Sequence, residues 1–396
     1  MYFMKRSTLF HIVLVLSASI FVSCKDKDKI AEGNNQIIHF DVSGWTNNHK
    51  IPWTVISKLK FIPLETNANC IMGEPRKLCL HNNKFYLTDM GVNKRIFIFN
   101  TSGNYLGSIG SYGKGPGEFI NLTDFFINKT QNQLFVLDND QRKVIVYDLQ
   151  TAKFLYDFKI TFSAHDFAMI DDNKLVFYSK VPQNKSGKSF SIAIMNLDDK
   201  SYNWFLAQDE LDTSLSGINS IFQSFNTYYA PYLKDIVYRI TSNSIEPAIL
   251  FNFGQNKLPE ERLKDFRKNP RIILDLLKER KDWIYGIENV LETDKFLTFN
   301  LEVSRNTVIV IYSKETGSFF YGNQYEDLLG VFPQFINIAA SENEFYGFIN
   351  SYFFVRGKDK ILQQNNWILK EEYLKAINSI QEESNPVIIS IEYNSF

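Results

Sequence analysis

The residues best placed to take part in chemistry are six polar side chains that precede short apolar runs. Nine positions before the first residue of each run, within a shift of two positions, lie Arg76, Asp124, His165, Asn219, Glu288 and Asn337. Their cationic, carboxylate, imidazole and amide groups can together hydrogen-bond a polar ligand. We predict that they line one rim of a central channel and bind a ligand there. The alternative is that they cap strands or are solvated at the rim.

Several classes of enzyme can be compared with this set. Glycoside hydrolysis needs two carboxylates about 5–10 Å apart, and Asp124 and Glu288 are available, although they fall in the second and fifth of the six segments. A metal site built from several histidines is not expected, because only His165 belongs to the set. The Gly-x-Ser-x-Gly motif of serine hydrolases does not occur in the sequence. We therefore predict no catalytic residue, no metal site and no cofactor.

A glycine-rich stretch at residues 107–119, GSIGSYGKGPGEF, raises the question of phosphate binding. A Walker loop requires Gly-Lys followed by Ser or Thr, but Gly113-Lys114 is followed by Gly115. A dinucleotide loop requires Gly-x-Gly-x-x-Gly, and this spacing is not met either. The stretch leads into a β-like run instead of a helix that could bind an anion at its N-terminus. We predict that these glycines form tight turns between two sheets.

A repeat in the sequence predicts the strands that must position these residues. Residues 84–100 (KFYLTDMGVNKRIFIFN) and 133–148 (QLFVLDNDQRKVIVYD) each contain a β-rich run ending in Asp, a polar turn and a second run. Asp89 and Asp138 are 49 positions apart. A period of 40–50 residues built from strands is typical of the blades of a β-propeller.

Four further pairs of runs continue the pattern. They are 174–179 with 190–196, 227–232 with 235–241, 295–301 with 307–313, and 344–350 with 352–357. The sequence therefore predicts an all-β fold, a six-bladed β-propeller of four-stranded antiparallel blades. The 35 Phe and 20 Tyr residues are expected to fill the wedges between blades. The aromatic segments 222–232 and 319–325 are expected in this core, with stacking on sugar rings as the alternative.

The residues of the first repeat support a resemblance to a known family. Asp89, Asn93–Ile96, Gly103–Leu106, Ile109-Gly110 and Gly113–Phe119 resemble an NHL-type propeller repeat. Together with the N-terminal signal described below, the chain resembles the six-bladed β-propeller lipoproteins of Bacteroidota. The motif is clear over about 84–148 and faint afterwards. The resemblance implies a fold and a cellular location, but no reaction.

Two segments interrupt the repeat with helical patterns. Residues 258–283 begin with Pro259 and two acidic residues, as a helix start prefers, and Pro270 should divide them into two helices. Residues 366–382 place Leu369, Tyr373, Ile377 and Ile380 on one face. Both insertions are expected to pack on the propeller, with a role as a lid or partner-binding element as the alternative. The strand-like residues 386–393 should close the ring by pairing with N-terminal strand material such as 37–40 or 58–65.

The N-terminus has the features of an export signal. Lys5 and Arg6 precede an apolar run from Leu9 to Val22, too short for a membrane span. The run ends in Val22-Ser23-Cys24, which resembles a bacterial lipoprotein signal in which Cys24 is lipidated. A plain secretory signal is the alternative. Cys70 and Cys79 would be about 30 Å apart if extended, too far for a disulfide, so we expect two buried thiols.

These patterns predict three parts: a signal peptide at 1–23, a lipidated cysteine with a flexible tether at 24–36, and one propeller domain at 37–396. A net charge of −1 gives no electrostatic basis for binding nucleic acid. The expected location is the cell envelope, lipid-anchored to the outer membrane and facing the periplasm or the surface. We predict a binding or scaffold module for a glycan, a peptide or an envelope protein. A carbohydrate-active hydrolase or lyase with its site at the channel mouth is the alternative.

Overall fold

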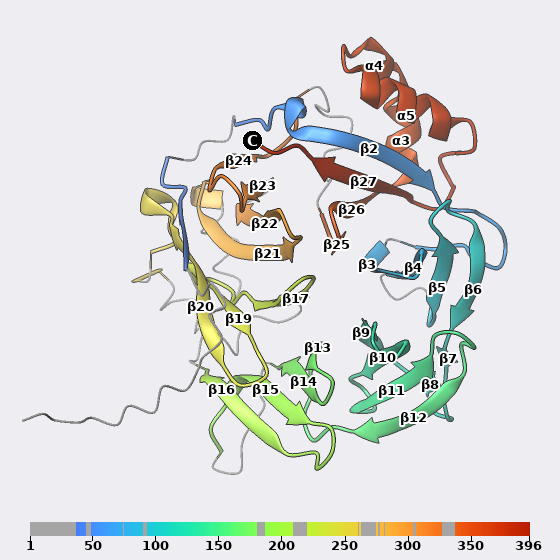
Figure 1. Cartoon of the computed structure of the whole chain (residues 1–396), viewed down its shortest axis with the longest axis vertical. Coiled ribbons are helices and arrows are strands. Elements are labelled where there is room, and N and C mark those ends of the chain that lie inside the picture. The colour runs from blue at the N-terminus through green and yellow to red at the C-terminus, as the bar shows by residue number, and fades with distance from the viewer. Residues whose placement is uncertain are drawn as a thin grey trace, which may run out of the picture. The chain divides into compact units, whose positions relative to one another are not determined.

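The computed structural model describes a ring of six small β-sheets (Figure 1). The described residues are 37–44, 49–73, 75–89, 93–179, 187–208, 220–259, 261, 262, 275, 278–280, 282–303, 306–326 and 337–396. Neighbouring strands within each repeat pair antiparallel, which is the architecture of a six-bladed β-propeller. The predicted fold class is confirmed.

Each blade runs from an innermost to an outermost strand. Blade 1 contains β3 (Pro75–His81), β4 (Lys84–Asp89), β5 (Ile96–Asn100) and β6 (Tyr105–Ile109). Blade 2 contains β9 (Leu122–Asn128), β10 (Gln133–Asp138), β11 (Lys143–Asp148) and β12 (Phe154–Lys159). Blade 3 contains β13 (Asp166–Asp171), β14 (Lys174–Tyr178), β15 (Phe190–Asn196) and β16 (Tyr202–Ala207).

The remaining three blades follow the same order. Blade 4 contains β17 (Ile221–Gln223), β18 (Thr227–Tyr229), β19 (Ile236–Ile240) and β20 (Ile245–Asn252). Blade 5 contains β21 (Ile284–Glu292), β22 (Phe296–Val303), β23 (Asn306–Ser313) and β24 (Phe319–Gly322). Blade 6 contains β25 (Ala339–Ser341), β26 (Glu344–Ile349), β27 (Val387–Tyr393) and β2 (Ile56–Pro63).

The ring is closed by strands from the two ends of the propeller unit. β2 pairs antiparallel with β27, so blade 6 combines residues 56–63 with residues from the C-terminal part of the chain. This is the closure that the sequence predicts, with 58–65 as the partner. The other candidate strand, β1 (Ile38–Asp41), pairs parallel with β20 and makes blade 4 five-stranded. β1 thereby covers the outer edge of that blade.

One predicted strand is a helix. Residues 352–357 are assigned by the repeat to the second strand of the sixth pair, but they fall mainly in α3 (Ser351–Arg356). The side chain of Asn350 accepts a hydrogen bond from the backbone N–H of Tyr352 and caps this helix. Ser351 and Phe354 are buried on its inner side. The strand that pairs with β26 in this position is β27, 38 positions after the end of β26.

The C-terminal helical insertion is confirmed. α4 (Lys358–Gln363) and α5 (Trp367–Ile377) follow α3 between β26 and β27. Asn366 caps α5 by accepting from the N–H of Leu369, and Leu369 and Tyr373 are fully buried against the propeller. Tyr373 donates a hydrogen bond to the carbonyl of Phe354 at 3.0 Å. Most of the other predicted insertion, 258–283, lies outside the described residues; Arg262 and Glu279 within it form an ion pair at 2.9 Å.

The glycine-rich stretch forms turns, as predicted. It holds the end of β6 and two short strands, β7 (Ser111–Tyr112) and β8 (Glu118–Phe119), which pair parallel with each other. Gly110 has φ +82, and a Cβ there would lie 2.2 Å from the ring of Phe119. Gly117 has φ +70, and its carbonyl accepts from the hydroxyl of Tyr147. The glycines therefore allow the chain to pass closely between blades 1 and 2.

Aromatic side chains fill the wedges between blades. Phe126 of blade 2 and Phe167 of blade 3 meet edge to face at 4.7 Å. Tyr178 of blade 3 and Tyr229 of blade 4 lie 5.7 Å apart. In the segment 222–232, Tyr228 and Tyr229 are buried as expected for core residues, whereas Phe225 is 67% exposed. Two short 3-10 turns, η1 (Trp53–Val55) and η2 (Gly254–Asn256), lie in the connections.

Candidate binding site

The innermost strands of all six blades enclose a central cavity of about 340 Å³. β3, β9, β13, β17, β21 and β25 all contribute to its wall. The backbone of these strands is held by their blades, so side chains that reach the cavity are positioned by rigid elements. A volume of this size matches the lower end of the range for small-molecule sites, roughly 300–1,000 Å³.

Two of the six predicted rim residues lie at the start of this channel. Arg76 on β3 is exposed and lines the cavity, and none of the described residues forms an ion pair with it. Asp124 on β9 is buried between blades instead of facing the cavity. Its Oδ1 lies 2.5 Å from the Nζ of Lys77, and its Oδ2 accepts from the N–H of Phe167 at 3.1 Å. Asp124 therefore links blade 2 to both of its neighbours.

The other predicted residues that the structure describes lie at separate places and do not line the cavity. His165 is half-buried just before β13, and its N–H donates to the carbonyl of Tyr178. Asn337 is buried before β25 and donates through Nδ2 to the hydroxyl of Tyr393 at 3.0 Å. Glu288 lies half-buried on β21. Asn219 lies outside the described residues. Among those described, only Arg76 lines the cavity, and Asp124 is held directly behind its wall.

A second carboxylate, Asp166, continues the interblade contacts. Asp166 begins β13, lines the cavity and is 4% exposed. Its Oδ2 accepts from the N–H of Ser220 at 2.6 Å at the start of blade 4. Lys77, Asp124 and Asp166 thus form a charged cluster along three neighbouring innermost strands. The contacts of the two carboxylates also show that the innermost strands start at the same end of the channel.

The electrostatics of this cluster are set by burial and by close opposite charges. Burial alone would lower the pKa of Lys77, but the carboxylate of Asp124 outweighs it and the pKa is raised. Burial, followed by the charge of Asp124, raises the pKa of Asp166 to about 7. Cys79, two residues after Lys77 on β3, is a half-buried thiol in the cavity wall, and burial raises its pKa to about 11. This thiol is protonated at neutral pH and is not an activated nucleophile.

Cys70 and Cys79 are free thiols, in agreement with the prediction that they do not form a disulfide. Both were expected to be buried, but Cys79 is only half-buried. Cys70 is fully buried, and burial raises its pKa. Only Cys79 has contact with the cavity.

Glu288 has a partner that sequence reasoning missed. Glu288 lies opposite Asn300 in the register of β21 and β22, and Glu302 lies opposite Gly286 on the same face. Burial, followed by the charge of Glu302, raises the pKa of Glu288 to about 7. Burial also raises the pKa of Glu302, although Thr307 donates a hydrogen bond to it at 3.1 Å. This carboxylate pair does not belong to the cavity wall, which blade 5 supplies through Asn289 and Leu291.

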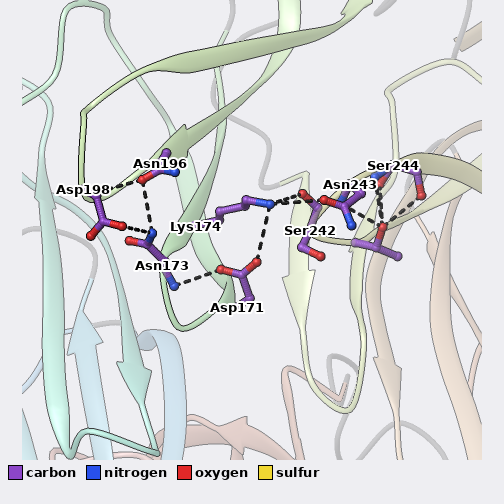
Figure 2. A network of polar contacts seen from close by, with 9 residues as sticks. Asp171, Asn173, Lys174, Asn196, Asp198, Ser242, Asn243 and Ser244 are labelled. Atoms are coloured by element: carbon purple, nitrogen blue, oxygen red, sulfur yellow. Dashed lines mark hydrogen bonds and ion pairs between the residues drawn. The ribbon is translucent and has the colours of Figure 1, made fainter.

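At the other end of the channel, the cavity is bordered by the turns that follow β9 and β13. Asp171 lines the cavity and is neutralised by Lys174, whose Nζ lies 3.8 Å away. Figure 2 shows that Lys174 also reaches the turn between β19 and β20, where it donates to the carbonyl of Ser242 at 3.0 Å and to Asn243 at 3.2 Å. The turns of blades 3 and 4 are therefore tied together at this end.

Beside this network, two cavity-lining charges are left for a ligand. Lys129 and Asp172 are exposed and have no ionic partner in the described part of the chain. With Arg76 at the start of the channel, the cavity offers cations and carboxylates along its length. Nothing among the described residues groups three or more His, Cys, Asp or Glu side chains as a metal site would need. The arrangement is suited to hydrogen-bonding a polar ligand.

Two residues that line the cavity lie directly beside residues predicted from the sequence. Lys77 follows the predicted Arg76, and Asp166 follows the predicted His165. Lys129 and Asp172 carry a usable signal, because each directly follows the apolar run of an innermost strand.

Comparison with known protein families gives one match over most of the chain. The model of a family described as "Domain of unknown function (DUF4934)" matches residues 47–392. No curated protein matches the chain. In the part of the chain that the structure describes, no helix has the length and apolar character to span a bilayer.

Solved structures from Bacteroides share the fold. A "Putative exported protein" from Bacteroides fragilis superposes with a TM-score of 0.72 at 20% identity, covering 91% of this chain and 100% of that one. A member of the DUF4221 family from Bacteroides vulgatus superposes with a TM-score of 0.50 at 10% identity, covering 86% of this chain and 98% of that one. At these identities the likeness concerns the fold alone. The resemblance to NHL-type repeats and to lipoproteins stays a prediction.

Proposed function

Because this chain belongs to the DUF4934 family and folds as a β-propeller, we propose that it is an exported, lipid-anchored binding protein of the cell envelope. Its central channel holds a polar ligand, which is a glycan, a peptide or a segment of an envelope protein. The observation that carries the proposal is the cavity of about 340 Å³ to which all six innermost strands contribute. Arg76, Lys129 and Asp172 supply its unpaired charges.

A binding role fits the chemistry of the channel better than a catalytic one. Among the charged groups of the cavity wall, Lys77 is paired with Asp124 behind it, and Asp166 accepts a hydrogen bond from the N–H of Ser220. The one thiol in the wall, Cys79, has a raised pKa and is held protonated. General acid–base and nucleophilic catalysis need an activated group within reach of a substrate.

The proposed location rests on the N-terminal sequence. An apolar run preceded by Lys5 and Arg6 and followed by Cys24 is the pattern of an exported lipoprotein. The fold likeness to a "Putative exported protein" agrees with export. The balanced charge of the chain argues against nucleic acid as the partner.

Binding in the channel can be tested with purified protein and two defined probe panels, linear oligosaccharides and short peptides. Isothermal titration calorimetry should detect binding to members of one panel. Arg76→Ala should weaken that binding at least tenfold, whereas Lys153→Ala, an exposed cation away from the cavity, should leave it unchanged. Binding that is insensitive to Arg76→Ala, or no binding to either panel, would contradict the channel as the site.

One observation supports a second candidate function, a carbohydrate-active enzyme. Glu288 has a pKa of about 7, as a general acid requires, and a second carboxylate, Glu302, on the neighbouring strand. The pair considered from the sequence, Asp124 with Glu288, is disfavoured because Asp124 is engaged by Lys77. The enzymatic alternative predicts release of reducing sugar from an oligosaccharide that is lost in Glu288→Gln and retained in Asp199→Asn, which changes an exposed carboxylate outside the cavity. Turnover retained in Glu288→Gln would reject this residue.

A further inference from the structure

A second hollow, a groove of about 810 Å³, lies between blades 6 and 1. Blade 6 forms one wall through all four of its strands, and blade 1 forms the other through the turn between β3 and β4 and through Thr101. Leu80 and Lys129 line both this groove and the central cavity. The groove and the central cavity therefore adjoin each other at these two residues.

The lining residues of blade 6 come from all four of its strands and include cross-strand neighbours. On the blade 6 wall, Lys60 lies opposite Ser390, and Ser390 lies opposite Tyr346. A second row, two residues further along each strand, contains Lys58, Glu392 and Glu344. Both rows cross the strands at right angles. Since neighbouring strands are about 4.8 Å apart, a row that crosses four strands is about 14 Å long.

Most charges on this wall are paired with one another. Lys58 Nζ lies 2.5 Å from Glu392 and 3.7 Å from Glu344, and Lys60 lies 3.9 Å from Glu344. Tyr346 donates a hydrogen bond to Glu344. Burial opposes ionisation of Glu344, but this hydrogen bond and the two ammonium groups hold its pKa below the usual range. The exposed Glu342 on the turn between β25 and β26 adds a third carboxylate to this wall. Lys129 at the inner end adds a third cation, so the charges of the groove as a whole, counted with Lys58, sum to zero.

The opposite wall adds neutral hydrogen-bonding groups, and the inner end adds a buried amide beside the cation Lys129. Asn82, Asn83 and Thr101 are exposed on the turns of blade 1, and Asn343 is exposed on the turn between β25 and β26. Where the groove meets the channel, Asn128 is 5% exposed and lines the cavity. Its Oδ1 accepts from the N–H groups of Thr130 and Gln131, while its Nδ2 has no acceptor among the described residues. An unpaired buried donor is costly unless a ligand supplies the acceptor.

From this geometry we propose that the groove and the channel together form one binding site for a linear, uncharged oligosaccharide. Hydroxyl groups both donate and accept, which matches walls of amides, hydroxyls and paired carboxylates. A groove without net charge gives no attraction for a polyanion. A peptide would instead be expected to pair with a free strand edge and to place side chains in apolar pockets. The rows of polar side chains on this wall run across the strands instead of along an edge. The inference rests on the proposed binding function and specifies its ligand.

The length of the site leads to a direct test. Isothermal titration calorimetry of the full mature chain with linear hexose oligomers of one to six units should show affinity rising at least tenfold from the monosaccharide to the hexamer. A single-pocket site would show no such increase. Equal affinity for the monosaccharide and the hexamer, or preference for hexapeptides of neutral composition, would overturn the proposal.

A blocking variant and a matched control locate the site. Thr101→Trp places a large side chain in the groove, and we expect it to weaken hexamer binding at least tenfold. Gln150→Trp places the same side chain on the corresponding exposed turn of blade 2, outside the groove, and should bind as the parent does. Lys129→Ala, at the junction of groove and channel, should also weaken hexamer binding. This variant tests the groove independently if Thr101→Trp lowers the melting temperature.

The outcomes separate this inference from the proposed function. Hexamer binding that is weakened by Arg76→Ala but unchanged by Thr101→Trp and Lys129→Ala would reject the groove and leave the channel as the binding site. If only peptides bind, and Arg76→Ala weakens that binding, the oligosaccharide groove is likewise rejected and the channel is kept as the binding site. Failure of both panels to bind would reject both proposals.

Discussion

Lys77, which lines the channel, and Asp124 join blades 1 and 2, with the Nζ of Lys77 2.5 Å from Oδ1 of Asp124. Asp124 is buried, and Lys77 is half-buried. Because Asp124 also accepts from the N–H of Phe167, this pair connects three consecutive blades. A buried carboxylate tolerates its position only while its charge is compensated.

Replacing the cation should therefore destabilise the propeller. We expect Lys77→Met to lower the free energy of unfolding by about 3 kcal/mol, at the lower end of the range for breaking a buried pair because Lys77 keeps some contact with water. Urea unfolding followed by tryptophan fluorescence measures this change. The double variant Lys77→Met/Asp124→Asn should recover most of the loss, since an amide oxygen still accepts from Phe167 without carrying a charge. No recovery would mean that lost packing, not the uncompensated charge, causes the effect.

The pKa of Asp166 predicts a dependence of stability on pH. Its folded-state value of about 7 lies above the usual value near 4, so the folded protein binds this proton more tightly than the unfolded chain does. Protonation of Asp166 therefore contributes to the free energy of unfolding. This contribution is fully present below about pH 4 and is lost as the pH rises to about 7. Asp166→Asn should remove this contribution while keeping an acceptor for the N–H of Ser220.

The measurement compares urea unfolding at pH 5 and pH 8. The loss of stability between these pH values should be smaller in Asp166→Asn than in the parent protein. Asp172→Asn changes an exposed carboxylate near the end of the same strand, and should keep the parental difference. An unchanged pH difference in Asp166→Asn would show that its ionisation is not coupled to folding.

Asn385 should be important for closing the ring. Its side chain is 3% exposed, donates to the carbonyls of Glu65 and Cys70 at 2.6 and 2.7 Å, and accepts from the N–H of Met72. Asn385→Ala leaves these buried groups unpaired, which should cost about 3 kcal/mol. The melting temperature should fall by several degrees.

Asn394 provides the control for this prediction. It also donates to a carbonyl of the N-terminal part, that of Thr54 at 2.8 Å, but it is exposed. Asn394→Ala should cost less than about 0.5 kcal/mol, as usual for surface positions. Equal losses of stability in the two variants would show that the contribution of the Asn385 hydrogen bonds does not depend on burial.

The predicted lipid anchor leads to a fractionation experiment. Cys24→Ala should move the full-length protein from the detergent phase to the aqueous phase in Triton X-114 partitioning, because the acyl chains supply the membrane affinity. Cys79→Ala, which removes a thiol of the propeller instead, should leave the protein in the detergent phase. Retention of the Cys24→Ala protein in the detergent phase would contradict lipidation at this residue.

The strand pairs of the first five blades could be predicted from the sequence because they are local. The two central strands of each blade are close in the chain, as β10 and β11 are, and their apolar runs and polar turns are visible in the sequence. The glycines between blades 1 and 2 are likewise explained locally. The closing strand β2 was predictable because a ring of sheets must pair material from both of its ends.

Only the tertiary structure decided the contents of blade 6 and of the channel. Residues 351–356 have apolar residues suited to a strand or a helix, and they form a helix because β27, far along the chain, takes the place beside β26. The pairing of Lys77 with Asp124 joins residues 47 positions apart. Such contacts depend on packing between blades, and the spacing of residues in one chain does not contain that information.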